Sequence, residues 1–270
     1  MRILIRTSRM AIWARRLGSV AIPLVIIAVL LHRFRLITSD LFMAAAITAG
    51  LVALVAVLVS LLALARLWWS GDQGWGKALA GLLFGTIALM PFLYFGSLAM
   101  RYPAVTDIAT AARDAMPLMF EPGTAAMPPP RMLSAVQMAE EFPNVETRTY
   151  PLGIIPTFAL VQQLVADNGW DVRRLSEPGE VGQVNAQIMT LPGWREEVVV
   201  RVTGSADQSA VDMRSASLHA LHDFGSNGQR IEAFLAALDE AVTTTLRDNP
   251  AANQPAEADS EAEAPAPQAQ

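Results

Sequence analysis

The sequence contains no cysteine, only three histidines and a charged fraction of 17%. The lack of cysteine excludes disulfide bonds, thiolate metal sites and cysteine nucleophiles. The histidines offer few candidates for a metal site, and the chain has neither a P-loop nor a GxGxxG motif, so we predict no cofactor. Acidic residues predominate after residue 100. This argues against nucleic acid as a partner, because phosphate binding needs a basic face.

Hydrophobic residues, by contrast, make up 53% of the chain and concentrate before residue 101. Residues 41–65 and 78–100 carry no Asp, Glu, Arg or Lys, and both exceed the length of about 18 apolar residues that marks a candidate span. Residues 17–31 form a shorter apolar stretch after five arginines, as in a signal peptide. However, the run HRFR at residues 32–35 stands where a cleavage site would need small residues. We therefore predict three transmembrane helices over residues 1–100, with an interfacial helix as the alternative for the first.

Basic residues near the ends of these spans are unevenly distributed. Seven lie on the side of the N-terminus and three, Arg33, Arg35 and Arg101, on the other side. Cytoplasmic loops carry an excess of Lys and Arg, so the N-terminus is predicted in the cytoplasm and the chain after Met100 outside. In a bacterium, this makes a multi-pass inner-membrane protein with a periplasmic C-terminal domain and the lipid bilayer as a partner. The two long spans lack an internal ionisable residue, which argues against a transporter.

The third span contains a GxxxG motif at Gly81 and Gly85. Such a motif lets two helices approach closely, and we expect it to act within this chain rather than between copies. The alternative is that glycine is simply frequent in transmembrane helices.

The rest of the chain divides into a connector, a domain and a tail. Residues 101–143 are interrupted by prolines, and the triplet at 128–130 favours a semi-rigid spacer. Residues 144–247 alternate between two periodicities: strands are predicted at 145–152, 170–176, 183–190, 196–203 and 210–217, and helices at 156–168 and 228–246. Short turns join successive strands, so the predicted fold class is α+β, an antiparallel sheet in the order β-α-β-β-β-β-α with its helices on one face. Residues 248–270 are Ala/Pro/Glu-rich and predicted to be disordered.

The candidate site lies where the last strand meets the last helix. Alternation places Asp212 and Arg214 on one face of the strand, close enough to pair, and Ser215 and Ser217 on the other. Arg230 lies in the first turn of the predicted last helix, where the helix dipole opposes a cation. We therefore expect Asp212 or Asp223 beside Arg230. The full set of candidate binding residues is Asp212, Arg214, Ser215, Ser217, Asp223, Asn227 and Arg230, with Asn227 as the predicted N-cap.

Three interpretations of this set stay open: a structural network that locks the helix to the sheet, an anion- or polar-ligand site built on Arg214 and Arg230, and a catalytic site. Serine, histidine and aspartate are all present, but no nucleophile elbow is. His219 and His222 have no third metal ligand nearby in sequence. We predict a binding or scaffolding module for a lipid, an amphiphile or an envelope partner. The alternative is a membrane-anchored hydrolase with Asp212 or Asp223 as general base.

The spacing of these residues resembles the signature of domain-of-unknown-function family 1499, in the runs DMRSAS at 212–217, DFGSN at 223–227 and RI at 230–231. The run TDIAT at 106–110 resembles a segment that membrane-anchored bacterial members carry after their last span. The resemblance covers roughly residues 101–247 and implies the same layout, without implying an activity. Departures from the family pattern are Leu218 in place of arginine, Ala220 near a usual glycine, and Pro143-Asn144 without a following cysteine.

Overall fold

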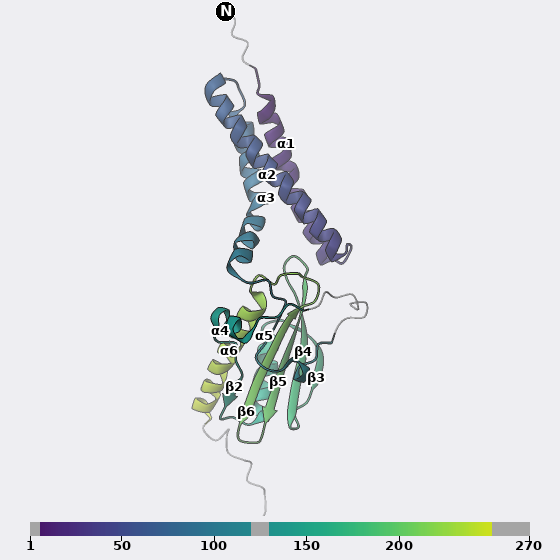
Figure 1. The fold of residues 1–270 in the computed structure, drawn as a ribbon, viewed down its shortest axis with the longest axis vertical. Helices are drawn as coiled ribbons and strands as arrows, with labels where there is room; N and C mark the ends of the chain where they lie inside the picture. The colour runs from purple at the N-terminus through teal and green to yellow at the C-terminus, as the bar shows by residue number, and fades with distance from the viewer. Residues whose placement is uncertain (1–5, 120–129, 250–270) are drawn as a thin grey trace, which may run out of the picture.

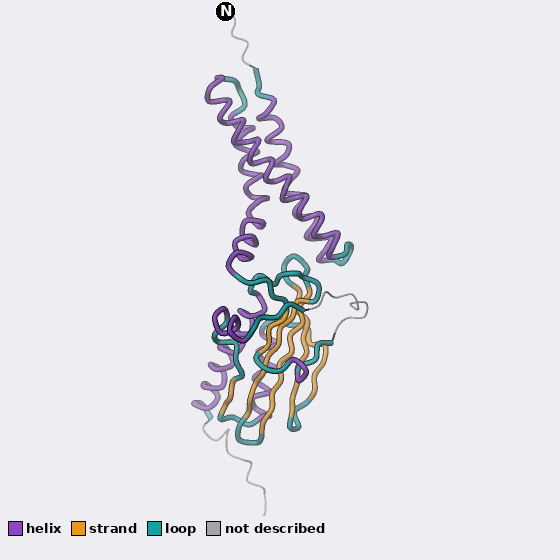
Figure 2. Tube along the Cα trace, viewed as in Figure 1, coloured by secondary structure: helices purple, strands orange, loops and turns teal. Residues whose placement is uncertain are grey.

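The computed structural model describes residues 6–119 and 130–249 and consists of a helical part and an α+β part (Figure 1; Figure 2). The helical part contains α1 (Arg9–Arg33), α2 (Ser39–Ser70) and α3 (Trp75–Arg101), each long and apolar enough to cross a membrane. At about 1.5 Å per residue, even α1 exceeds the roughly 30 Å hydrocarbon thickness of a bilayer. The predicted tail lies outside the described residues from residue 250 onwards.

The three helices contact one another through small residues that recur at alternating steps of three and four. In α3 the buried positions are Ala78, Gly81, Gly85 and Ala88. This spacing is the seam of a left-handed helical bundle. A Cβ on Gly81 would lie 2.6 Å from the carbonyl oxygen of Ala14 in α1, and one on Gly85 would lie 3.2 Å from the Cβ of Ala56 in α2. The GxxxG motif therefore makes close helix contacts within the chain.

The α+β part is built on one antiparallel sheet with the order β1-β6-β5-β4-β3, and β2 also pairs with β6. The strands are β1 (Asp107–Ala109), β2 (Arg148–Tyr150), β3 (Asp171–Ser176), β4 (Val181–Met189), β5 (Arg195–Gly204) and β6 (Ser209–Ser217). The helices of this part are α4 (Ala135–Glu141), α5 (Ile154–Asp167) and α6 (Ser226–Asp248), with a 3-10 turn, η1, at Arg113–Ala115. From β2 onwards the order is β-α-β-β-β-β-α, which confirms the predicted fold class.

The stretch interpreted as a connector, residues 101–143, supplies an additional edge strand. In β1, Ile108 pairs with Ser215 of β6, and its side chain is fully buried. The chain then crosses the sheet on the face opposite the helices, where Met116 is buried. Apolar side chains anchor this segment although its prolines prevent a long helix. Of the proline triplet, residues 128 and 129 lie outside the described residues.

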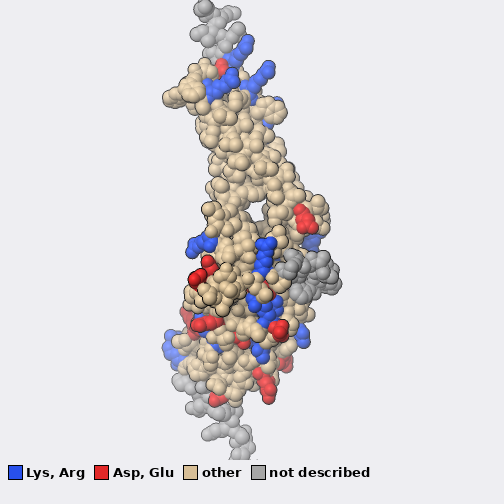
Figure 3. Space-filling view, viewed as in Figure 1, with Lys and Arg blue, Asp and Glu red and all other residues tan. Residues whose placement is uncertain are grey.

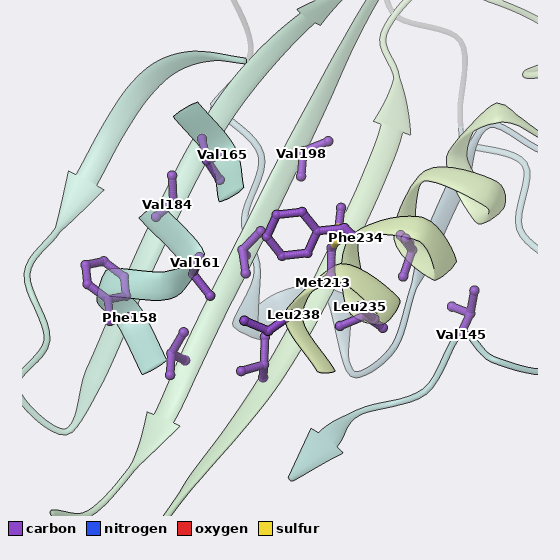
Figure 4. Close-up of a cluster of buried hydrophobic side chains, with 14 of the residues drawn as sticks. Val145, Phe158, Val161, Val165, Val184, Val198, Met213, Phe234, Leu235 and Leu238 are labelled. Atoms are coloured by element: carbon purple, nitrogen blue, oxygen red, sulfur yellow. The ribbon is translucent and has the colours of Figure 1, made fainter. Parts of the chain in front are cut away.

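The hydrophobic core lies between the sheet and the two long helices α5 and α6, which cover the same face (Figure 4). The side chains that meet there include Val161 and Val165 from α5 and Phe234 and Leu238 from α6. The strands contribute every second residue, such as Val198 of β5 and Met213 of β6, because successive strand side chains point to opposite faces.

The turn between β4 and β5 joins the domain to the end of α1. Nδ1 of His32 lies 2.7 Å from the carbonyl oxygen of Pro192, and the His32 ring lies 4.9 Å from the ring of Trp194. Arg33 donates from Nη1 to the Thr190 carbonyl at 2.9 Å. Gly193 has a φ of 95°, and a Cβ there would lie 2.7 Å from the Cα of Arg33. Glycine is therefore required both by the turn and by the contact.

Candidate functional site

A pocket of about 650 Å³ lies between the helical part and the domain. The ends of α1, α2 and α3 nearest the domain form most of its wall, and the β4–β5 turn, Glu196 of β5 and residues from 220–229 form the rest. Every lining residue contributed by the three helices is uncharged, among them Ala46, Phe92 and Phe95. The space-filling view shows the helices separated by an opening just above the domain (Figure 3). The pocket is therefore an apolar chamber with its domain end at the sheet.

The pocket begins where the seam of small residues ends. Small residues occupy the α3 seam as far as Ala88. The next two positions at the same spacing are Phe92 and Phe95, and both line the pocket. Pro91, beside them, cannot donate the helical hydrogen bond that another residue would make there. Helices that pack closely near the N-terminus are thus held apart by aromatic side chains near the domain.

The domain supplies the polar end of the pocket. Phe224 has a φ of 56°, an uncommon conformation for a residue other than glycine, and its ring lies 5.1 Å from that of Phe95 in α3. The Phe224 ring also stacks on His222 at 4.6 Å. The Nδ1 of His222 accepts the Phe224 N–H at 2.9 Å, so the proton of the neutral ring is on Nε2. The polar residues that line this end are Glu196, His222, Asp223, Ser226 and Gln229.

Glu196 is held at this end by the first turns of α6. Its side chain is only 4% exposed and forms an ion pair with Arg230. The carboxylate also accepts hydrogen bonds from Ser217 and Ser226, each at 3.1 Å. Arg230 in turn donates to Ser215 at 2.8 Å. A buried carboxylate at the start of β5 is therefore neutralised by a guanidinium and satisfied by two hydroxyl groups.

The predicted partners of Arg230 were wrong. Asp212 lies on the opposite face of the sheet, and Asp223 turns towards the start of α6, so neither reaches Arg230 as Glu196 does. The sequence carried a signal for this partner. Glu196 is in phase with the buried residues of β5, which are Val198, Val200 and Val202. A carboxylate on that face needs a partner.

The prediction of Asn227 as N-cap was also wrong. The N-cap position is Gly225, with a φ of 80°, because the glycine turn starts α6 at Ser226. The Asp223 carboxylate accepts the N–H groups of Gly225 at 3.0 Å and of Asn227 at 3.2 Å, and burial raises the pKa of Asp223. The Asn227 side chain is buried between helix and sheet, where its Nδ2 donates to Ser217 at 3.1 Å.

Asp212 and Arg214 share a face, as predicted, but they do not pair with each other. Nε and Nη2 of Arg214 donate to the two carboxylate oxygens of Asp107 at 3.0 and 2.8 Å. Asp212 accepts hydrogen bonds from Thr110 at 3.2 Å and Thr147 at 2.6 Å. The β1 strand, which the sequence did not predict, brings Asp107 to the edge of β6 and replaces the expected pair.

The structure thus distributes the seven candidate residues over two faces of the sheet. Four of them, Ser215, Ser217, Asn227 and Arg230, form one network with Glu196. Asp223 adjoins this network and is the only one of the seven that lines the pocket. Arg214 and Arg230, proposed from sequence as an anion site, lie on opposite faces, and each is paired with a carboxylate. Sequence reasoning missed Glu196 and Asp107.

Three helices able to cross a membrane, followed by this antiparallel sheet and its buried network, define a class: an α+β domain that follows three candidate membrane-spanning helices. Within that class, residues 124–238 match the model of a family described as protein of unknown function (DUF1499). The match confirms the resemblance drawn from the sequence and leaves the three helices outside it. No curated protein matches the chain.

Proposed function

We propose that this protein is an inner-membrane protein that binds a membrane lipid in the pocket between its helices and a periplasmic domain. The observation that carries the proposal is the position of the pocket along the helices. Its lining runs from Phe42 to Ile47 on α2 and from Pro91 to Ala99 on α3. At about 1.5 Å per residue, these stretches reach roughly 12–15 Å from the helix ends towards the bilayer centre. The surrounding medium at that depth is lipid acyl chains.

The orientation is supported by the distribution of charge. The N-terminal segment and the α2–α3 loop lie at the same end, where the Ser8 N–H donates to the Gln73 carbonyl at 2.9 Å. That end carries Arg9, Arg66 and Lys77 together with exposed tryptophans Trp68 and Trp69. An excess of Lys and Arg favours the cytoplasm, and tryptophan favours the headgroup region. The domain is then in the periplasm, and the pocket opens in the leaflet on its side.

A hydrolase is the second candidate. One observation favours it: Asp223 lines the pocket, and burial raises its pKa, as a general base requires. Against it, both oxygens of Asp223 already accept backbone N–H groups at the start of α6. The other predicted base, Asp212, lies on the opposite face of the sheet. Release of free fatty acid from a phospholipid by the purified protein would favour the hydrolase.

The test fills the pocket from the helical side. Ala46 lines the pocket, whereas Ala44, two residues earlier on α2, is exposed and lies outside the lining. We expect the wild type to retain lipid through detergent purification, as measured by native mass spectrometry. Ala46→Trp should lose that lipid and the control Ala44→Trp should keep it. Equal retention in both variants would contradict the proposal. A protein that co-purifies in place of lipid would support an envelope partner instead.

A further inference from the structure

We infer that the pocket selects lipids whose head group donates hydrogen bonds and carries no net negative charge. This inference rests on the proposed lipid binding and specifies the class of lipid. Its starting point is the charge of the polar end. Among the residues that line the pocket, which all belong to the described part of the chain, the acids are Glu196 and Asp223, and there is no Lys or Arg.

The cations near this end are engaged elsewhere. Arg230 pairs with Glu196 but is not part of the pocket lining. Arg33 reaches the β4–β5 turn, where its guanidinium donates to the carbonyls of Thr190 and Leu191 at 2.9 and 3.4 Å. A phosphate at the polar end would therefore find no Lys or Arg in the lining to pair with and would lie beside the Asp223 carboxylate, while Arg230 offsets the charge of Glu196. Like charges at such short range repel more strongly there than in water.

The hydrogen-bonding groups of the polar end point to the same conclusion. Each oxygen of Asp223 accepts one N–H group and its side chain is fully buried, so its hydrogen bonds stay with the start of α6. The Glu196 carboxylate is paired with Arg230 and accepts hydrogen bonds from Ser217 and Ser226. The Nε2–H of His222 is a donor that a hydroxyl oxygen can satisfy. A hydroxylated head group both donates and accepts, whereas a phosphate dianion only accepts. The accessible polar groups of this end, the His222 ring, the Ser226 hydroxyl and the Gln229 amide, therefore fit a glycerol-like or other hydroxyl-bearing head group.

The positions of the apolar and polar parts of the lining determine the orientation of such a lipid. The apolar lining comes from the helices, and the polar lining comes from the domain. The acyl chain then lies between α2 and α3, and the head group lies at the domain end beside His222, Ser226 and Gln229. This is the orientation that a lipid already has in the leaflet on the domain's side, so entry requires sideways movement and not inversion.

The experiment compares two probes that differ only in a phosphate: 1-oleoylglycerol and 1-oleoylglycerol 3-phosphate. Both are titrated onto the full chain in detergent at pH 7, and binding is followed by native mass spectrometry. We expect the neutral lipid to bind at least tenfold more tightly. Equal or tighter binding of the phosphate lipid would overturn the inference and leave the proposed lipid binding intact. Failure of both probes to bind, with no retained lipid that Ala46→Trp removes, would overturn the proposed function itself.

A variant of the rim tests the electrostatic cause. Leu221 lines the pocket and is 56% exposed, so Leu221→Lys adds a cation without disturbing the core. It should reduce the preference for the neutral lipid several-fold. Val172→Lys on β3 is the matched control, because Val172 is 45% exposed and lies outside the pocket lining. If the two variants discriminate between the lipids equally, charge at the pocket does not set the selectivity.

Discussion

A small network of polar side chains connects α6 to the sheet. The ion pair of Arg230 with Glu196 is its central contact. Their side chains are 16% and 4% exposed. A buried pair contributes little net stability when intact, because desolvation offsets the attraction. Its loss is costly, because one charge stays buried without a partner. Asn227, Ser215 and Ser217 complete the network, which serves the fold and holds a carboxylate at the pocket.

Arg230→Ala should destabilise the protein by about 3–5 kcal/mol, because Glu196 would stay buried and unpaired. The measurement is thermal or urea unfolding of the full chain in detergent. The control, Arg247→Ala, breaks an exposed pair with Asp248 and should change stability by less than about 0.5 kcal/mol. If both variants unfold alike, the pair does not stabilise the fold.

Glu197 lies on the face of the sheet opposite α5 and α6, and it should make the stability of the fold depend on pH. Its side chain is buried and accepts a hydrogen bond from Asn185 at 3.1 Å, and burial raises its pKa. Because the pKa of Glu197 is higher in the folded than in the unfolded protein, this residue contributes stability at pH values below its unfolded-state pKa. That contribution is lost as the pH rises through its folded-state pKa. Glu197→Gln keeps an acceptor and removes the charge, so it should be more stable than wild type at neutral pH.

The predicted gain should disappear on acidification below the ordinary glutamate pKa of 4.5, where Glu197 of the wild type is protonated in both the folded and the unfolded protein. Melting temperatures across this range measure it. Glu240→Gln, at an exposed position of α6, is the control and should follow the wild type. A Glu197→Gln variant with the same pH profile as wild type would contradict the assigned role.

Among the elements, the β4–β5 turn decides how the domain sits on the helices. It contacts α1 through His32 and Arg33, and Trp194 beside it lines the pocket. The turn is thus both a structural contact and a pocket wall. The seam of small residues has the complementary role: it holds α1, α2 and α3 together near the N-terminus and ends before the pocket.

Gly193→Ala should loosen the domain from α1, because its Cβ would lie 2.7 Å from the Cα of Arg33. Gly169→Ala is the matched control: its φ of 66° imposes similar backbone strain, but no atom lies within 4 Å of the added Cβ. Hydrogen exchange at the end of α1 should become faster in Gly193→Ala only, and lipid retention should fall. Similar exchange in the two variants would show that strain in the turn, and not the contact, is responsible.

For the whole molecule, the proposed topology has one direct test. Alkaline phosphatase, which is active only outside the cytoplasm, should be active when fused after Asn249 and inactive when fused after Asp72 in the α2–α3 loop. The reason is the seven-to-three distribution of basic residues between the two sides. A cytoplasmic reporter at the same two sites should give the reverse pattern. The opposite set of activities would place the domain in the cytoplasm.

The sequence by itself determined most of the helices and strands of this protein, although not β1. Uncharged stretches predicted α2 and α3, and alternation predicted β4, β5 and β6 within two residues of their ends. Burial periodicity is local, since it depends only on whether side chains repeat every 3.6 or every 2 residues. It also showed that Asp212 and Arg214 face away from Ser215 and Ser217.

Only the tertiary structure decided which side chains meet. Arg230 and Glu196 are 34 residues apart, and Arg214 and Asp107 are 107 residues apart. Periodicity assigns a side chain to a face but not to a neighbour, so Asp212 and Asp223 were equally plausible partners for Arg230. The pocket was even harder to predict from the sequence, because it exists only where Phe92 and Phe95 hold three helices apart next to the domain. Its shape depends on packing between segments that the sequence keeps far apart.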